Sequence, residues 1–158
     1  MTLLGGELFG DKTTSWFDIW SIEHLFSGFG LSSLARRLID PEHRSIPSKR
    51  MRSIALVTLV LALAWECIEH YIEEGVTTSD QITYWFQGVE FWGNRLLTDP
   101  FIVVLGAILA QRYQHLSAIG KLFSACWLAV HLFLLPNSMS LQEALSDMSA
   151  HANAAPFL

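Results

Sequence analysis

Charge is scarce in this chain of 158 residues, since only 16% of them are Asp, Glu, Lys or Arg. A typical soluble domain carries about 25% charged residues. Basic charge is scarcer still: 15 acidic residues stand against 10 basic ones, and this balance argues against a nucleic-acid-binding protein. The two cysteines exclude a disulfide-stapled scaffold and a four-cysteine zinc site. Phosphate-binding loops, nucleophile elbows and Rossmann fingerprints are also missing.

What the sequence has in abundance is apolar side chains, at 51% of the residues. Four apolar segments are evident, at about residues 17–38, 53–72, 100–113 and 119–135. The second is the clearest, because about 20 apolar residues cross a bilayer as one helix. A soluble protein with buried helices is the alternative, but a soluble surface helix should show a polar face, which this segment lacks. The sequence therefore predicts an all-α integral membrane protein, a four-helix bundle in residues 1–136.

Residues 79–98, between the second and third crossings, are rich in aromatic side chains of the kind that gather at the headgroup level of a membrane. We expect one interfacial helix here, which would leave Glu90 and Asn94 solvated. Asp99-Pro100 then marks the start of the third crossing. Residues 137–158 are predicted to be a polar, non-cytoplasmic tail with a short surface helix.

The orientation in the membrane follows from the basic residues, which gather in two of the connections between crossings. By the positive-inside rule these connections face the cytoplasm, so both termini lie outside it. The residues concerned are Arg36, Arg37, Arg44, Lys49, Arg50, Arg52, Arg112 and Lys121.

Each predicted crossing carries a ligand-type side chain at a similar depth near the outer face. At 100° per residue, Glu66, Glu69 and His70 share one arc of the second helix with Glu73. Unpaired charges inside a bilayer cost about 2.5–3.5 kcal/mol each, so these side chains must face partners, protons or a cation. We expect a metal site with His24, Glu66, Glu69 and His70 as ligands, holding one or two ions of iron, zinc or manganese.

Two further residues complete this hypothesis. Asp99 stands at the mouth of the third crossing, and His131 lies about one turn from the outer end of the fourth. Both are assigned catalytic roles, as acid, base or support of the ligands. The alternatives are that Asp99 is only a helix cap and that His131 only packs in the core.

Three motifs resemble the VanZ-like group of small bacterial polytopic membrane proteins. They are His24 to Gly28, Trp65-Glu66-Cys67-Ile68-Glu69, and Asn94 to Asp99 with Leu105-Gly106-Ala107. The resemblance covers about residues 18–110 and implies a protein of the bacterial cell envelope, in the inner membrane. The founding member of that group is linked to glycopeptide tolerance, but the resemblance supplies no reaction.

Three functions stay open at this point. The first is a metal-dependent enzyme acting on a lipid or lipid-linked substrate at the outer leaflet. The second is a haem or redox subunit of a membrane complex, with His24 and His131 as axial ligands. The third is a non-catalytic accessory or assembly protein that contacts other membrane subunits through a buried polar network.

Overall fold

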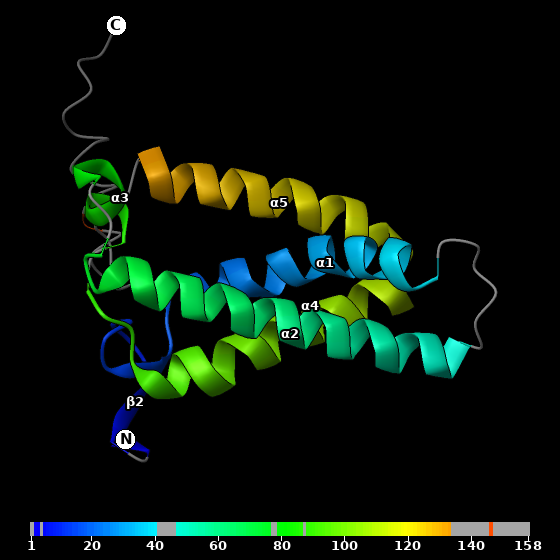
Figure 1. Cartoon of the computed structure of the whole chain (residues 1–158), viewed down its shortest axis with the longest axis horizontal. Helices are drawn as coiled ribbons and strands as arrows, with labels where there is room; N and C mark the ends of the chain where they lie inside the picture. The colour runs from blue at the N-terminus through cyan, green and yellow to red at the C-terminus, as the bar shows by residue number, and fades with distance from the viewer. Residues whose placement is uncertain are drawn as a thin grey trace, which may run out of the picture.

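Four long helices make up most of the chain that the computed structural model describes, which covers residues 2–3, 5–40, 47–76, 79–86, 88–133 and 146. They are α1 (Trp20–Ile39), α2 (Pro47–Glu73), α4 (Asp99–Arg112) and α5 (Gln114–Phe133). The helices lie side by side, and α1 contacts each of the other three (Figure 1). The predicted, mostly helical class is therefore confirmed.

Helix boundaries follow local signals in the sequence. Before α1, the Asp18 carboxylate accepts a hydrogen bond from the Ser21 N–H at 2.9 Å, and the Ser21 hydroxyl accepts one from the Asp18 N–H at 3.1 Å. This reciprocal pair satisfies amides that a helix start leaves free. Pro47 opens α2, where its missing N–H has no cost. Only Tyr113 separates α4 from α5, so the last helix starts about five residues before its predicted bound.

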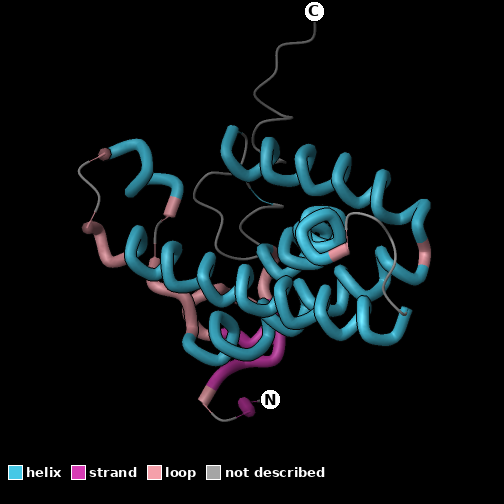
Figure 2. Tube along the Cα trace, turned by 45° about the vertical axis from the view of Figure 1, so that its right-hand side comes forward, coloured by secondary structure: helices cyan, strands magenta, loops and turns pink. Residues whose placement is uncertain are grey.

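A small sheet corrects the all-α prediction. Its strands are β1 (Thr2–Leu3), β2 (Gly6–Phe9) and β3 (Ser15–Phe17), in the order β1-β2-β3. β2 pairs antiparallel with β1, with Thr2 opposite Glu7, and parallel with β3, with Phe9 opposite Phe17. The sheet lies beside the end of the bundle where α1 begins (Figure 2). β1, β2 and most of β3 precede the first predicted crossing, but Phe17 was expected at the start of that helix.

The predicted single interfacial helix over residues 79–98 is broken in the structure. α3 covers only Asp80–Trp85, and Gly88 adopts a φ of 75°, a left-handed conformation that favours glycine and ends a helix. The chain becomes helical again at Trp92, and η1 (Asn94–Thr98) is a π-helical turn that runs directly into α4. Pro100 cannot donate a hydrogen bond within a regular helix, and the wider turn before it accommodates this.

The closest helix contact is the seam between α1 and α4. A Cβ atom built on Gly28 would lie 2.2 Å from the Val103 carbonyl oxygen, and one on Gly106 would lie 2.3 Å from that of Leu25. Only glycine allows the two backbones to approach this closely. Val103, Ala107 and Ala110 of α4 are buried along the same helix. This seam fixes the position of the first turn of α1 against that of α4.

Large apolar side chains cover the outside of the bundle. Within the described residues, Ser48–Glu73 is the one helix that is long and apolar enough to cross a membrane by itself, and most of its apolar window faces outward. Four crossings are therefore not shown. Apart from Ser146, the predicted tail 137–158 lies outside the described residues. The exposed apolar residues include Leu56, Val60, Ile68, Phe101, Leu105, Ile119, Leu122 and Phe123.

Candidate metal centre

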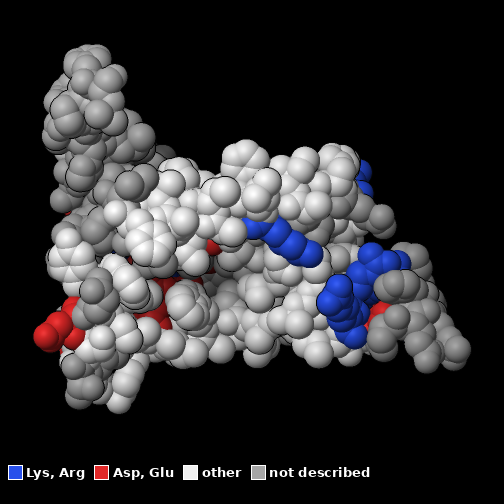
Figure 3. All heavy atoms as spheres, turned by 90° about the horizontal axis from the view of Figure 1, so that it is seen from above, with Lys and Arg blue, Asp and Glu red and all other residues white. Residues whose placement is uncertain are grey.

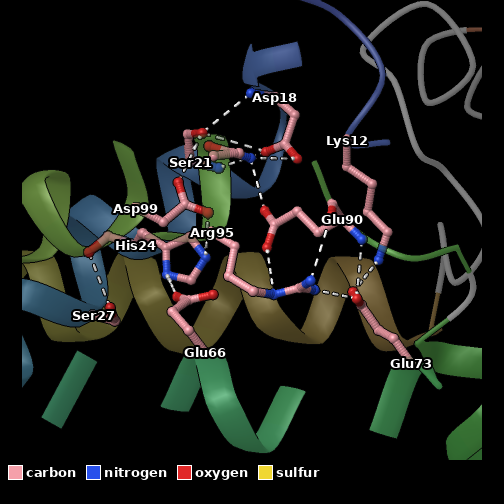
Figure 4. Close-up of polar contacts among 11 residues, drawn as sticks. Lys12, Asp18, Ser21, His24, Ser27, Glu66, Glu73, Glu90, Arg95 and Asp99 are labelled. Atoms are coloured by element: carbon pink, nitrogen blue, oxygen red, sulfur yellow. Dashed lines mark hydrogen bonds and ion pairs between the residues drawn. The ribbon is translucent and has the colours of Figure 1, made fainter. Parts of the chain in front are cut away.

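A buried polar cluster lies at the end of the bundle where α1 and α4 begin and α2 ends (Figure 1). Most of its members are less than one tenth exposed, although they carry charge. Figure 4 shows nearly all of them pointing toward one another from four parts of the chain. The cluster comprises Lys12, Asp18, Ser21, His24, Glu66, Glu69, Glu73, Glu90, Asn94, Arg95 and Asp99.

The centre of the cluster is a contact between α1 and α4. His24 Nε2 lies 3.1 Å from Asp99 Oδ2, and the Ser21 hydroxyl donates to Asp99 Oδ1 at 3.2 Å. Asp99 is fully buried. Because η1 continues into α4, Asp99 lies inside a continuous helical stretch and makes no side-chain cap. Asp99 therefore lies in the buried cluster and is not a helix cap, and its catalytic role stays a prediction.

Glu66 of α2 faces this contact and is 1% exposed. Neither of its carboxylate oxygens accepts a hydrogen bond, and its ion-pair contact is His24 Nδ1, 4.0 Å from Oε1. A buried carboxylate without a hydrogen bond costs several kcal/mol unless a proton or a cation compensates it. The geometry of Glu66 therefore leaves room for an additional partner.

Two sets of side chains bring ligand atoms close enough to hold a metal ion. One set is His24, Glu66 and Glu69, and the other is Glu66, Glu90 and Asp99. In each set one ligand atom per residue lies within 4.8 Å of the others. An imidazole with carboxylates suits iron, zinc or manganese. These buried His, Glu and Asp groups could hold a metal.

A second layer of ion pairs closes the cluster toward the sheet. The Lys12 ammonium donates to Glu73 Oε1 at 2.8 Å, and an Arg95 guanidinium nitrogen pairs with Glu73 Oε2. The Glu90 N–H donates to the same Oε2 at 3.0 Å. The Glu73 side chain is fully buried at the end of α2.

The two layers are joined through Asn94 in η1. Its amide nitrogen donates to Glu90 Oε1 at 2.7 Å and to Asp18 Oδ2 at 3.2 Å. Burial and the charges of Asp99, Glu69, Glu66 and Asp18 raise the pKa of the Glu90 carboxyl well above its ordinary value. This shift reflects burial first, and then the excess of carboxylates over cations in the site.

Four of the six predicted site residues meet in the cluster, namely His24, Glu66, Glu69 and Asp99. His70 does not join either metal-binding set in the described structure. Its side chain is exposed, and its Nδ1 lies 3.1 Å from an Arg95 guanidinium nitrogen. His70 was grouped with the ligands because it shares their helical arc, but it faces the rim. The His131 side chain lies outside the described residues, although α5 includes its backbone.

Sequence reasoning missed the contribution of residues 90–95. Glu90 and Asn94 were expected to be solvated, yet they are 7% and 0% exposed. Their spacing of four residues was a signal, since it places two polar groups on one helical face. Lys12 was missed because its partner Glu73 is 61 residues away in the chain. Such a long-range pair leaves no local pattern.

No protein-family model, curated protein sequence or solved structure gives a match to this chain. The resemblance to the VanZ-like group stays a prediction from short motifs.

Proposed function

We propose that this chain is an integral membrane protein whose buried polar cluster binds a divalent transition-metal ion between His24, Glu66 and Glu69. The observation that carries the proposal is the Glu66 carboxylate, which is 1% exposed and accepts no hydrogen bond. His24 and Glu69 supply the other ligand atoms within 4.8 Å. The contact of His24 Nε2 with Asp99 orients the ring so that Nδ1 faces Glu66, as a supporting carboxylate does for metal-bound histidines.

The membrane part of the proposal is supported by the apolar outer surface of α2, α4 and α5. α1 falls short of the composition of a spanning helix partly because Ser21, His24 and Ser32 are polar, but these side chains are buried and would not meet lipid. Small polar residues within a bundle are compatible with a crossing. Residues 92–112 form one continuous helical stretch, which lengthens the third predicted crossing.

Charge separates along the bundle in the way expected of a membrane protein. Basic residues lie at the end where α1 and α4 finish and α2 begins, including Arg36, Arg37, Arg50 and Arg112. Figure 3 shows acidic side chains toward the opposite, left-hand end. By the positive-inside rule the basic end would face the cytoplasm. The cluster and both termini would then lie on the outer side of a bacterial inner membrane.

A metal at this depth would supply an activated water near the outer leaflet. The substrate class that fits this location is a lipid or lipid-linked molecule. Axial ligation of haem by His24 is disfavoured, since its two ring nitrogens face Glu66 and Asp99. A non-catalytic accessory protein with a protonated polar network is the outcome to be distinguished by experiment.

The test is elemental analysis of the detergent-purified full-length protein, with a visible spectrum of the same sample. We expect at least one ion of iron, zinc or manganese per chain in the wild-type protein. The Glu66→Gln and His24→Ala variants should lose this bound metal. Glu74→Gln is the matched control, because Glu74 is an exposed carboxylate close to the same helix end. A folded wild-type protein that stays metal-free after incubation with each ion would overturn the proposal. A Soret band would move the function to haem binding.

A further inference from the structure

We infer that the cluster is a site for two divalent cations, bridged by Glu66. His24, Glu66 and Glu69 would hold the first ion, and Glu66, Glu90 and Asp99 the second. This inference rests on the proposed metal-binding function and extends it to a second ion. Glu66 is common to both sets of close ligand atoms, and this is the juxtaposition from which the inference starts.

Glu66 has the free coordination capacity that a bridge needs. Both of its oxygens are buried and accept no hydrogen bond, so each is available to one ion. The side chain is 1% exposed and points toward the His24 ring, whose other nitrogen faces Asp99 at the start of α4 (Figure 4). Carboxylates that bridge two metals hold them about 3.5–4 Å apart. The two ligand sets share one carboxylate, so they are near enough for this spacing.

The other ligands of the second ion are already oriented by their remaining oxygens. Asp99 Oδ1 accepts from Ser21, and Glu90 Oε1 accepts from Asn94. Glu90 Oε2 and Asp99 Oδ2 lie in the interior without a hydrogen bond. Asp99 Oδ2 has its ion-pair contact with His24, and Glu90 Oε2 lies 3.6 Å from Arg95 Nε. Asp99 Oδ1 and Glu90 Oε1 are thus fixed. Asp99 Oδ2 also orients the His24 ring, but a carboxylate oxygen has two lone pairs, so it can contact His24 and bind the second ion together.

The charges of the cluster match two divalent ions. Six carboxyl groups lie in it, against the two permanent cations Lys12 and Arg95. Metal binding displaces protons from its ligands, so every carboxyl group is ionised in the metal-bound state, and with histidine neutral four negative charges remain. One divalent ion would leave two of them uncompensated in a buried site, whereas two divalent ions would neutralise all four. The six groups are those of Asp18, Glu66, Glu69, Glu73, Glu90 and Asp99.

Arg95 does not fill the second position itself. One of its terminal nitrogens pairs with Glu73, and the other contacts His70 Nδ1 and the Glu90 carbonyl oxygen. Three acceptors, namely Glu73, His70 Nδ1 and the Glu90 carbonyl oxygen, therefore hold the guanidinium. Its Nε approaches Glu90 Oε2 only to 3.6 Å, and this oxygen, like both oxygens of Glu66, accepts no hydrogen bond from Arg95.

The test is titration of the metal-free, full-length protein with Mn²⁺, followed by electron paramagnetic resonance. We expect two Mn²⁺ per chain and a spin-coupled signal, because bridged ions interact magnetically. Glu90→Gln keeps an acceptor for Asn94 and removes the second ion's ligand. It should therefore bind one Mn²⁺ per chain and give the signal of an isolated ion. Glu74→Gln should behave as the wild-type protein does.

The outcomes separate the inference from the function on which it rests. Saturation of the wild-type protein at one uncoupled Mn²⁺ would overturn the bridge and leave the single-metal proposal standing. Binding of no Mn²⁺ or other divalent ion would overturn both. The wild-type stoichiometry decides the question without any variant, so a variant that fails to fold does not affect the test. A Glu69→Gln variant gives a second check, since it should lose the first ion and the coupling.

Discussion

Substitution of Gly28 by alanine should separate α1 from α4 and thereby disturb the cluster. The new Cβ would lie 2.2 Å from the Val103 carbonyl oxygen, whereas ordinary van der Waals contact begins at 3.4 Å. The deficit is about 1.2 Å, from the difference of these two distances. The obstacle is a backbone atom of a helix, so no side-chain rotation relieves it. The helices must move apart, shift along each other or bend.

The expected change in the free energy of unfolding for Gly28→Ala follows from two opposed effects. Overpacking of a close contact costs about 1–3 kcal/mol. Alanine in place of glycine inside a helix contributes about 0.5–1 kcal/mol in the other direction. We therefore expect a net loss of about 1–2 kcal/mol in the free energy of unfolding. His24 lies one turn before Gly28, so its 3.1 Å contact with Asp99 should lengthen beyond hydrogen-bond distance.

Gly30→Ala is the matched control on the same helix. A Cβ at Gly30 would have Lys121 Cγ as its neighbour at 3.9 Å, an ordinary contact. This variant should be as stable as the wild-type protein or up to about 1 kcal/mol more stable. The assay is thermal unfolding in detergent together with metal content. Equal effects of the two substitutions, or full stability and metal binding in Gly28→Ala, would refute the role assigned to the seam.

Two further predictions concern the ion pairs and the orientation. Glu73→Gln should lower the free energy of unfolding by about 3–5 kcal/mol, since it leaves the buried cations of Lys12 and Arg95 without their shared carboxylate. Glu74→Gln should be neutral in the same unfolding assay. After replacement of Cys67 and Cys126 by serine, Glu74→Cys should react with a membrane-impermeant maleimide added to intact cells, and Lys49→Cys should not. The reverse labelling pattern would contradict the proposed orientation.

The helices could be predicted because their signals are local. The four apolar segments start and end within a few residues of α1, α2, α4 and α5, apart from the early starts of α2 and α5. The first residues of these two helices are largely polar. They continue the helix, but hydropathy does not count them as part of an apolar segment. Gly28 with Ser32, and Gly106 with Ala110, form pairs of small residues four positions apart, a pattern that favours close approach of helices. The structure pairs these two glycines across the same seam.

The rest of the site depends on contacts between distant segments. His24 and Asp99 could be grouped by predicted depth, but their 3.1 Å contact requires the exact register of α1 against α4. The burial of Glu90 and Arg95 depends on the break at Gly88 and on η1, neither of which hydropathy detects. The β-sheet brings Lys12 to Glu73, and its short strands carry too few residues for a clear alternation.

Close packing of α1 against α4 and burial of the carboxylates have opposite effects on the stability of these helices. Gly28 and Gly106 allow α1 and α4 to approach closely, which buries His24 and Asp99 beside Glu66. That approach concentrates carboxylates in a dry space and therefore opposes folding unless protons or cations compensate them. Ser21, Asn94 and Arg95 satisfy only part of this need, since both Glu66 oxygens remain without hydrogen bonds. Tight packing at this seam would thus be favourable when a cation completes the site, which couples the stability of the bundle end to metal binding.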